Sequence, residues 1–119
     1  MGSGCLDTIH GKGGDDYING DGDGDRLYGD LGDDTIIGNF GSDQIYGGAG
    51  DDYLVGGDDS DVIFGEDGND LIFGGTGDNI MKGGPGKDHF DCGPDHNTIL
   101  DYNSTEDSVA DDCKDAQYA

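Results

Sequence analysis

Residues 47–75 read GGAGDDYLVGGDDSDVIFGEDGNDLIFGG, and in this stretch an acidic residue returns every nine positions. Asp52, Asp61 and Asp70 mark the interval, and a large aliphatic residue follows each of them two positions later. Like charges at a fixed interval repel one another, and the glycines between them favour neither helix nor strand. The stretch therefore needs a partner from outside the chain to fold.

The nine-residue period runs without insertion through residues 2–100, with degenerate units at 2–10 and 92–100. The first position is glycine in every unit from Gly2 to Gly83, and Cys92 breaks this rule. The sixth position is acidic or an amide: Asp7, Asp16, Asp25, Asp34, Asp43, Asp52, Asp61, Asp70, Asn79, Asp88 and Asn97. The eighth position is apolar: Ile9, Ile18, Leu27, Ile36, Ile45, Leu54, Ile63, Ile72, Met81, Phe90 and Ile99. A repeat at a fixed period of this kind predicts a solenoid.

Each nonapeptide predicts a turn of six residues rich in Gly and Asp, followed by a three-residue strand whose middle side chain points inward. Two nonapeptides complete one coil, so residues 18 apart in sequence stack at about 4.8 Å. A spacing of nine excludes an amphipathic helix. The sequence predicts an all-β, right-handed parallel β-roll (a β-solenoid) of about five to six coils. Residues 1–10 form a degenerate N-terminal repeat or tag, 11–100 the β-roll and 101–119 a C-terminal cap.

The composition leaves two states open. Of the 119 residues only 31% are hydrophobic, 26 are glycine, and the formal net charge is −23. Such values are typical of disordered chains unless a cation is part of the folded state. The constant phase of the acidic and apolar positions favours the second state. Five Lys and Arg residues exclude nucleic acid as a partner, and no apolar run is long enough for a transmembrane helix.

Stacking predicts two columns of sixth-position carboxylates, one at each edge of the roll. Neighbouring charges about 5 Å apart repel by roughly 1 to 3 kcal/mol for effective dielectric constants of about 80 down to 20. A divalent cation between successive carboxylates turns this repulsion into attraction. Carboxylates and free carbonyl groups without clustered His or Cys favour Ca²⁺ over transition metals, and Mg²⁺ demands a tighter octahedron.

These units resemble the calcium-binding nonapeptide G-G-x-G-x-D-x-U-x of the RTX (repeats-in-toxin) family. The resemblance implies that each ion lies between turns one coil apart. The earlier turn would give the carbonyls of its second and fourth residues and its sixth-position carboxylate. The later turn would give the carbonyls of its first and third residues and its own carboxylate.

The resemblance implies the following ligand sets. In one column they are Lys12, Gly14 and Asp16 with Gly29, Leu31 and Asp34; Asp30, Gly32 and Asp34 with Gly47, Ala49 and Asp52; Gly48, Gly50 and Asp52 with Gly65, Asp67 and Asp70; and Glu66, Gly68 and Asp70 with Gly83, Pro85 and Asp88. In the other column they are Asp21, Asp23 and Asp25 with Gly38, Phe40 and Asp43, and Asn39, Gly41 and Asp43 with Gly56, Asp58 and Asp61. Two weaker sets are Ser3, Cys5 and Asp7 with Gly20, Gly22 and Asp25, and Gly57, Asp59 and Asp61 with Gly74, Thr76 and Asn79.

Departures from the motif indicate which of these sites are expected to bind an ion more weakly. Asn79 and Asn97 lack the charge, so a site joining them is expected to be weak or empty. Asp23 and Asp59 replace the fourth-position glycine and are expected to strain their turns. Eight ions would bring the formal charge from −23 to about −7, a tolerable value for a soluble domain.

The ends of a solenoid expose core and strand edges, and RTX proteins are similar in needing a C-terminal capping segment. In residues 101–119 we expect Tyr102 and Val109 to cover the last coil and Asp107 to keep the acidic sixth position. Cys92 and Cys113 are candidates for a disulfide that pins the cap and indicates an oxidising compartment. Three free thiols are the alternative, and the role of Cys5 stays open.

The predicted function is that of a secreted or cell-surface calcium-binding protein that folds when the ions bind. No catalytic motif is present, so we expect no enzyme activity. The alternative is a calcium-dependent adhesion or oligomerisation module, or a fragment of a larger RTX exoprotein. Its contact surface, for a second copy or another protein, would be the outward ladders Ile37, Val55 and Phe73 and Tyr28, Tyr46 and Phe64. The alternative explanation of these ladders is that β-branched and aromatic residues are common on any sheet face, without a role in binding.

Overall fold

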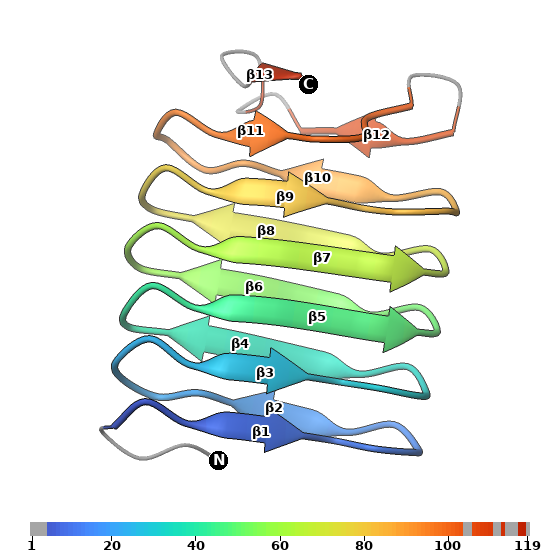
Figure 1. Ribbon diagram of the computed structural model, residues 1–119. Helices are drawn as coiled ribbons and strands as arrows, with labels where there is room; N and C mark the ends of the chain where they lie inside the picture. Colours follow the sequence, from blue (N-terminus) through green and yellow to red (C-terminus); the bar gives the residue numbers. More distant parts are fainter. Residues whose placement is uncertain (1–4, 104–105, 111–112, 114–116, 119) are drawn as a thin grey trace.

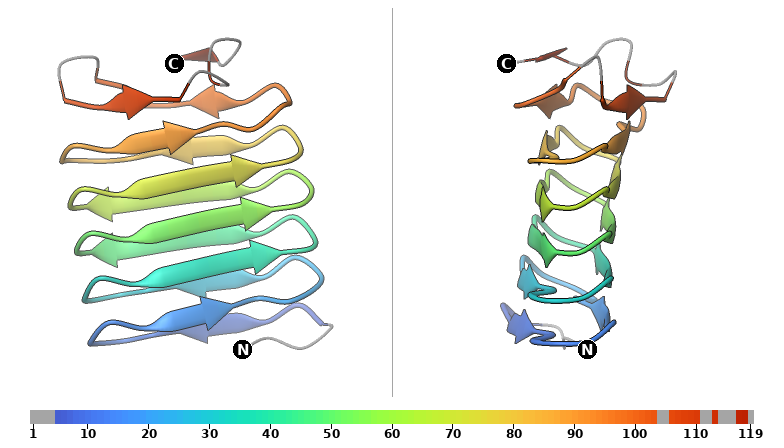
Figure 2. Two further views of the ribbon diagram at one scale, coloured as in Figure 1. Left: turned by 180° about the vertical axis from the view of Figure 1, so that it is seen from behind. Right: turned by 90° about the vertical axis from the view of Figure 1, so that its right-hand side faces the viewer.

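The computed structural model describes residues 5–103, 106–110, 113 and 117–118, and in these it contains strands and no α-helix. The strands are β1 (Thr8–His10), β2 (Tyr17–Asn19), β3 (Arg26–Tyr28), β4 (Thr35–Asn39), β5 (Gln44–Ala49), β6 (Tyr53–Gly57), β7 (Val62–Asp67), β8 (Leu71–Gly75), β9 (Ile80–Lys82), β10 (His89–Asp91), β11 (Thr98–Ile99), β12 (Ser108–Val109) and β13 (Gln117–Tyr118). Successive strands alternate between the two facing sheets of a flattened solenoid (Figures 1 and 2).

Both walls are parallel sheets. The odd-numbered strands form a seven-stranded sheet in the order β1-β3-β5-β7-β9-β11-β13, and the even-numbered strands form a six-stranded sheet in the order β12-β10-β8-β6-β4-β2. In Figure 1 the odd strands run to the right in front and the even strands run to the left behind, while the chain rises from the N-terminus. This path is a right-handed coil, the usual hand of parallel crossovers. The predicted β-roll is confirmed.

The register repeats every 18 residues, as the sequence predicts. Ile18 pairs with Ile36, and Ile36 with Leu54. The middle strands are longer than the expected three residues, because β5 and β7 extend to six residues each. Pairing continues into the turn, where Gly48 lies opposite Glu66. A backbone stacked in constant register keeps its hydrogen bonds even where no apolar side chain follows.

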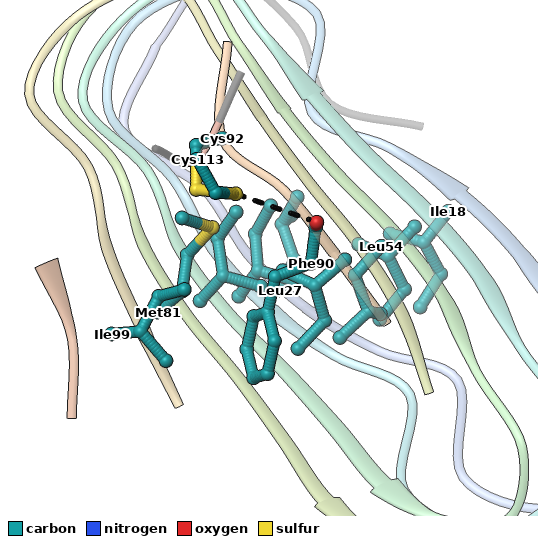
Figure 3. Packing of buried hydrophobic residues seen from close by; sticks show 12 residues of the cluster. Ile18, Leu27, Leu54, Met81, Phe90, Cys92, Ile99 and Cys113 are labelled. Carbon is teal, nitrogen blue, oxygen red and sulfur yellow. Dashed lines mark hydrogen bonds between the residues drawn. A yellow bond between two sulfur atoms is a disulfide. The ribbon is translucent and has the colours of Figure 1, made fainter. Parts of the chain in front are cut away.

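The core is a single file of eighth-position side chains from both sheets (Figure 3). From Leu27 to Ile99 these side chains have no solvent exposure, and Ile18 is 3% exposed. Such a narrow core buries little apolar surface for each residue that folding must order, so the core alone gives limited stability.

The last coil departs from the 18-residue spacing by one residue. His89 pairs with Ser108, and Thr98 pairs with Gln117, both at a separation of 19. Strict counting would place Glu106 at the acidic sixth position, whereas the structure places Asp107 there. The inserted residue lies in the segment that follows β11, where the nonapeptide pattern has already ended.

The capping segment covers the end of the core. Tyr102 and Val109 pack against the buried cluster, as expected for a cap. Cys92 and Cys113 form a disulfide, and both are fully buried at this end of the file (Figure 3). The Cys113 sulfur lies 3.4 Å from the carbonyl oxygen of Phe90. Cys5 is a free, exposed cysteine. The disulfide thus joins the first residue after β10 to the cap.

Gly68→Ala is expected to destabilise the fold, whereas Gly13→Ala is not. Gly68 has φ +118°, and a methyl group there would collide with the carbonyl group of Gly50 in the preceding coil. Gly13 has open space around it. We expect Gly68→Ala to lower the free energy of unfolding by at least about 1–3 kcal/mol and Gly13→Ala to change it by less than about 1 kcal/mol. Denaturant unfolding of both variants in one buffer makes the comparison, and equal losses would contradict it.

Candidate metal centre

The sixth-position residues line the two edges of the coil, in the turns that enter the strands. Asp34, Asp52 and Asp70 precede the even strands, whereas Asp43 and Asp61 precede the odd strands. Each of these carboxylates is only 1–2% exposed. The predicted columns are therefore present, and they are buried within the turns.

One oxygen of each carboxylate is fixed by the neighbouring coil. The N–H of Asp16 donates to Asp34 Oδ1 (2.8 Å), and the N–H of Asp34 donates to Asp52 Oδ1 (2.8 Å). The same bond recurs in the other column, where the N–H of Asp25 donates to Asp43 Oδ1 (2.8 Å). This ladder orients the carboxylates of Asp25, Asp34, Asp43, Asp52, Asp61, Asp70 and Asp88 and leaves their second oxygen without a donor.

The second oxygen has no donor. Eight buried Oδ2 atoms have no hydrogen-bond partner among the described residues: those of Asp16, Asp25, Asp34, Asp43, Asp52, Asp61, Asp70 and Asp88. A buried polar atom without a partner costs about 1–3 kcal/mol, and a charged one costs more. Eight such atoms at equivalent positions are a property of the repeat, and they require a cation or a proton.

The first-position glycine keeps a space open beside this oxygen. A Cβ on Gly29 would lie 2.5 Å from Asp34 Oδ2 and 2.5 Å from the carbonyl oxygen of Gly47 in the next coil. For Gly11 the corresponding distances, to Asp16 Oδ2 and the Gly29 carbonyl oxygen, are 2.6 and 2.8 Å. The carboxylate and the carbonyl therefore face one common space. A side chain at this position would collide with both oxygens.

Several of the predicted carbonyl ligands already accept one backbone hydrogen bond. Leu31 N–H donates to the Lys12 carbonyl (2.7 Å), and Gly32 N–H donates to the Ala49 carbonyl (3.0 Å). A carbonyl oxygen has two lone pairs, so one lone pair remains for a cation. The carbonyl oxygens at the second and third turn positions thus accept backbone hydrogen bonds and still have a lone pair for a metal ion.

Burial raises the pKa of seven carboxyl groups in the two columns: Asp25, Asp34, Asp43, Asp52, Asp61, Asp70 and Asp88. The pKa is about 8 for Asp61 and Asp70 and about 7 for Asp52. Loss of hydration is the largest cause; the hydrogen bond from the preceding coil opposes it, and neighbouring carboxylates add to it. The metal-free fold therefore holds protons at a pH where exposed Asp is ionised.

The donor set fits a hard divalent cation. It consists of carboxylate and carbonyl oxygens, the ligands that Ca²⁺ prefers. In the part of the chain that the structure describes, no three His, Cys, Asp or Glu side chains converge on one point as a metal site. Stacked turns explain this, because each gap lies between only two carboxylates and the other oxygens belong to the backbone.

In two turns, the side-chain amide of a sixth-position asparagine contacts carbonyl oxygens of the same turn. Asn79 Nδ2 lies 3.3 Å from the Gly77 carbonyl oxygen and 3.5 Å from that of Gly75. Asn97 Nδ2 donates to the carbonyl oxygens of Cys92 (2.7 Å) and Asp95 (2.9 Å). The NH₂ groups thus satisfy carbonyls that a cation would otherwise need. Neither asparagine has an unpartnered buried polar atom.

Both fourth-position aspartates lie in the left-handed region of φ, at 68° for Asp23 and 72° for Asp59. Second-position residues such as Lys12 and Glu66 share this conformation, which costs about 1–3 kcal/mol for a residue other than glycine. At the N-terminal end, Ser3 lies outside the described residues. Asp7 is not among the eight carboxylates with an unpartnered oxygen.

Sequence reasoning missed one feature. Asp88 has an unpartnered Oδ2, yet the turn one coil later belongs to the cap. The predicted sixth position of Asp107 is confirmed, but no ligand set was predicted between Asp88 and the cap. The acidic residues of 101–107 were its only sequence signal.

A right-handed β-solenoid with two columns of buried carboxylates facing backbone carbonyls defines a cation-binding repeat protein. The sequence model of the RTX calcium-binding nonapeptide repeat, which spans four copies, matches residues 6–36, 28–63 and 64–99. The chain therefore belongs to the RTX calcium-binding nonapeptide repeat family, as the resemblance indicated. No curated protein and no solved structure matches it. In the described residues no helix is long and apolar enough to cross a membrane.

Without a metal ion, the chain is expected to fold in acid and to unfold as the pH rises. The folded-state pKa values lie above the ordinary 3.8, so their stabilisation is complete below about pH 4 and is lost as the pH rises through about 6 to about 8. Far-UV circular dichroism of metal-free protein between pH 3 and 9 measures this, with light scattering as the control for aggregation. More β-structure at pH 8 than at pH 4 would contradict it.

Asn79→Asp is expected to open a closed turn to a cation. The variant loses the NH₂ group that faces two carbonyls and gains a buried anion, so it should be less stable without calcium and bind one more ion with it. Asn69→Asp is the matched control, because it makes the same charge change at an exposed turn position. Native mass spectrometry at saturating calcium counts the ions. An unchanged count in Asn79→Asp would refute the amide explanation.

Proposed function

We propose that this chain is a calcium-conditional folding module that acts outside the cell. It is unfolded where calcium is scarce and folds where calcium is millimolar. RTX repeat proteins are typically secreted, which agrees with this setting. The single observation that carries the proposal is the row of buried, unpartnered carboxylate oxygens.

The argument is energetic. In a metal-free fold at neutral pH, each Oδ2 must be protonated or remain a buried anion beside its neighbours. Both options cost free energy, and a core one side chain wide offers little to offset it. A divalent cation satisfies the carboxylates and carbonyls together. Metal binding and folding then become one equilibrium.

We place seven ions between stacked turns, each beside one unpartnered oxygen from Asp16 to Asp70 in the two columns. Every inner carboxylate would border two ions, so we expect cooperative binding. The eighth expected ion, between Asp7 and Asp25, would need Ser3. Individual sites are expected to bind with dissociation constants of about 10⁻⁴–10⁻³ M, like other extracellular calcium modules.

The alternative function, adhesion or oligomerisation, has weaker support. The outward ladders are half-buried rather than fully exposed. Tyr28 stacks on Tyr46 and Tyr46 on Phe64, with ring centroids 4.9 and 5.3 Å apart. The rings cover one another's faces, which favours a role in protecting the sheet. Tyr53 and Leu71 are more open, at 41% and 40% exposure, so sedimentation belongs in the test below.

We expect the metal-free chain to be unfolded at pH 8 and to gain β-structure steeply on calcium addition. Asp52→Asn should raise the calcium midpoint about tenfold or more and make the titration less steep, because Asp52 borders two gaps. Asp51→Asn removes the same charge from the adjacent exposed position and should leave the midpoint nearly unchanged.

Circular dichroism and sedimentation velocity along one calcium titration make both measurements. A full β-sheet spectrum in EDTA at pH 8 would refute calcium-conditional folding. Equal midpoints for the two variants would refute the assignment of Asp52 as a ligand. A folding transition that occurs only together with dimer formation would favour the adhesion alternative.

A further inference from the structure

The turn that contains Asp88 faces the cap rather than another nonapeptide. Asp88 is 2% exposed, and its Oδ2 has no hydrogen-bond partner among the described residues. Its N–H donates to Asp107 Oδ1 (3.0 Å), so the cap continues the carboxylate ladder. Asp107 Oδ2 in turn accepts from the N–H of Asn103 (2.8 Å). Asp107 is thus held by backbone donors on both oxygens.

The cap brings a further carboxylate to this turn. In other coils the first-position N–H donates to a neutral carbonyl; for example, Gly29 N–H donates to the Tyr46 carbonyl (2.9 Å). Gly83 instead donates to Asp101 Oδ1 (3.0 Å), and Gly84 donates to Asp101 Oδ2 (2.7 Å). The cap therefore puts an anion where the other turns have a neutral oxygen.

Both carboxylates border the same glycine. A Cβ on Gly83 would collide with Asp88 Oδ2, and the N–H of Gly83 contacts Asp101. Both Asp101 and Asp107 act electrostatically on Asp88, and no ion pair neutralises any of the three within the described part of the chain. Anions gathered beside a buried, unpartnered oxygen need a cation to be stable together.

We propose that Asp88 and Asp101 are the side-chain ligands of a terminal cation site that fastens the cap to the last coil. The site takes a hard divalent cation, and its assignment to Ca²⁺ rests on the proposed function. Asp107 positions Asp88 through the N–H ladder. The carboxylate of Asp101 comes from the first turn position, a role that no inner site assigns to a side chain. The strand pairing of β12 with β10 then depends on the ion.

Asp101→Asn in the full chain tests the site against Asp95→Asn. Both substitutions remove one charge from a carboxylate that accepts a turn N–H, because Asp95 Oδ2 accepts from Gly77 (2.7 Å). Asp95, however, lies in the turn that Asn97 closes with its amide. Native mass spectrometry with calcium counts the ions. Hydrogen exchange follows the amides of Ser108 and Ala110, which donate to the Asp88 and Phe90 carbonyls.

We expect Asp101→Asn to bind one ion fewer than Asp95→Asn. It should also need about tenfold more calcium to protect Ser108 and Ala110, while the amide of Tyr53 in the middle coils keeps its midpoint. Equal ion counts and equal cap protection in the two variants would overturn the terminal site and leave the inner sites standing. A parent chain that binds no calcium would overturn the proposed function as well.

Asp101→Glu covers the case in which Asp101→Asn does not fold. It restores the charge with a longer side chain. Recovery of the fold together with the terminal ion supports the carboxylate as a ligand. Recovery of the fold without that ion, or failure of both variants to fold at saturating calcium, assigns Asp101 a structural role and overturns the proposal.

Discussion

A carboxylate oxygen without a donor, repeated in each coil, constrains the rest of this molecule. From Asp25 to Asp88, a backbone N–H of the preceding coil donates to one oxygen of each sixth-position Asp, as in the bond from Asp34 N–H to Asp52 Oδ1, and the other oxygen stays without a donor. Parallel stacking repeats this arrangement at the inter-strand spacing of about 4.8 Å, so the backbone hydrogen bonds themselves bring the charges together. The hydrogen bonding that stabilises the sheets and the repulsion between carboxylates that destabilises the fold therefore both follow from parallel stacking. Only a bound cation or a proton removes the repulsion while the sheets stay intact.

The same geometry links the glycine and aspartate phases of the nonapeptide. At Gly29 any side chain would fill the space between Asp34 Oδ2 and the Gly47 carbonyl oxygen. Under the proposed calcium binding this space would hold an ion, so the glycine would be required by the site as well as by the turn. A first-position alanine would fill the space beside the carboxylate oxygen even where the backbone conformation tolerates alanine. The first-position glycine and the sixth-position aspartate recur together in the nonapeptide because the space beside the carboxylate oxygen depends on both residues.

Sequence periodicity predicted the coil, its register and its core, because side chains 18 apart must stack once two nonapeptides close a turn. It also placed Tyr102 and Val109 over the end of the core. It could not give the six-residue length of β5, because backbone pairing through glycines leaves no side-chain pattern. It placed Asp107 at the acidic sixth position, as the structure confirms, but it assigned no ligand set to the turn that contains Asp107, because that turn lies outside the regular nonapeptides. The outward ladders were expected to be exposed, whereas the structure half-buries them, and in one ladder the rings of Tyr28, Tyr46 and Phe64 stack on one another.

The two edges of the roll end differently, and Cys92 shows why. Cys92 is the one residue in the first phase, from residue 2 to residue 92, that is not glycine, and its turn ends in Asn97. The amide of Asn97 donates to the Cys92 carbonyl, so under the proposed calcium binding this turn would hold no ion that a side chain could obstruct. The first-position glycine is thus replaced in a turn where the proposal needs no space for an ion. The freed position carries a cysteine that reaches Cys113 in the cap. One edge thus ends in covalent and amide bonds, which form without metal, while the other ends at Asp88, whose buried oxygen has no donor and requires a cation or a proton.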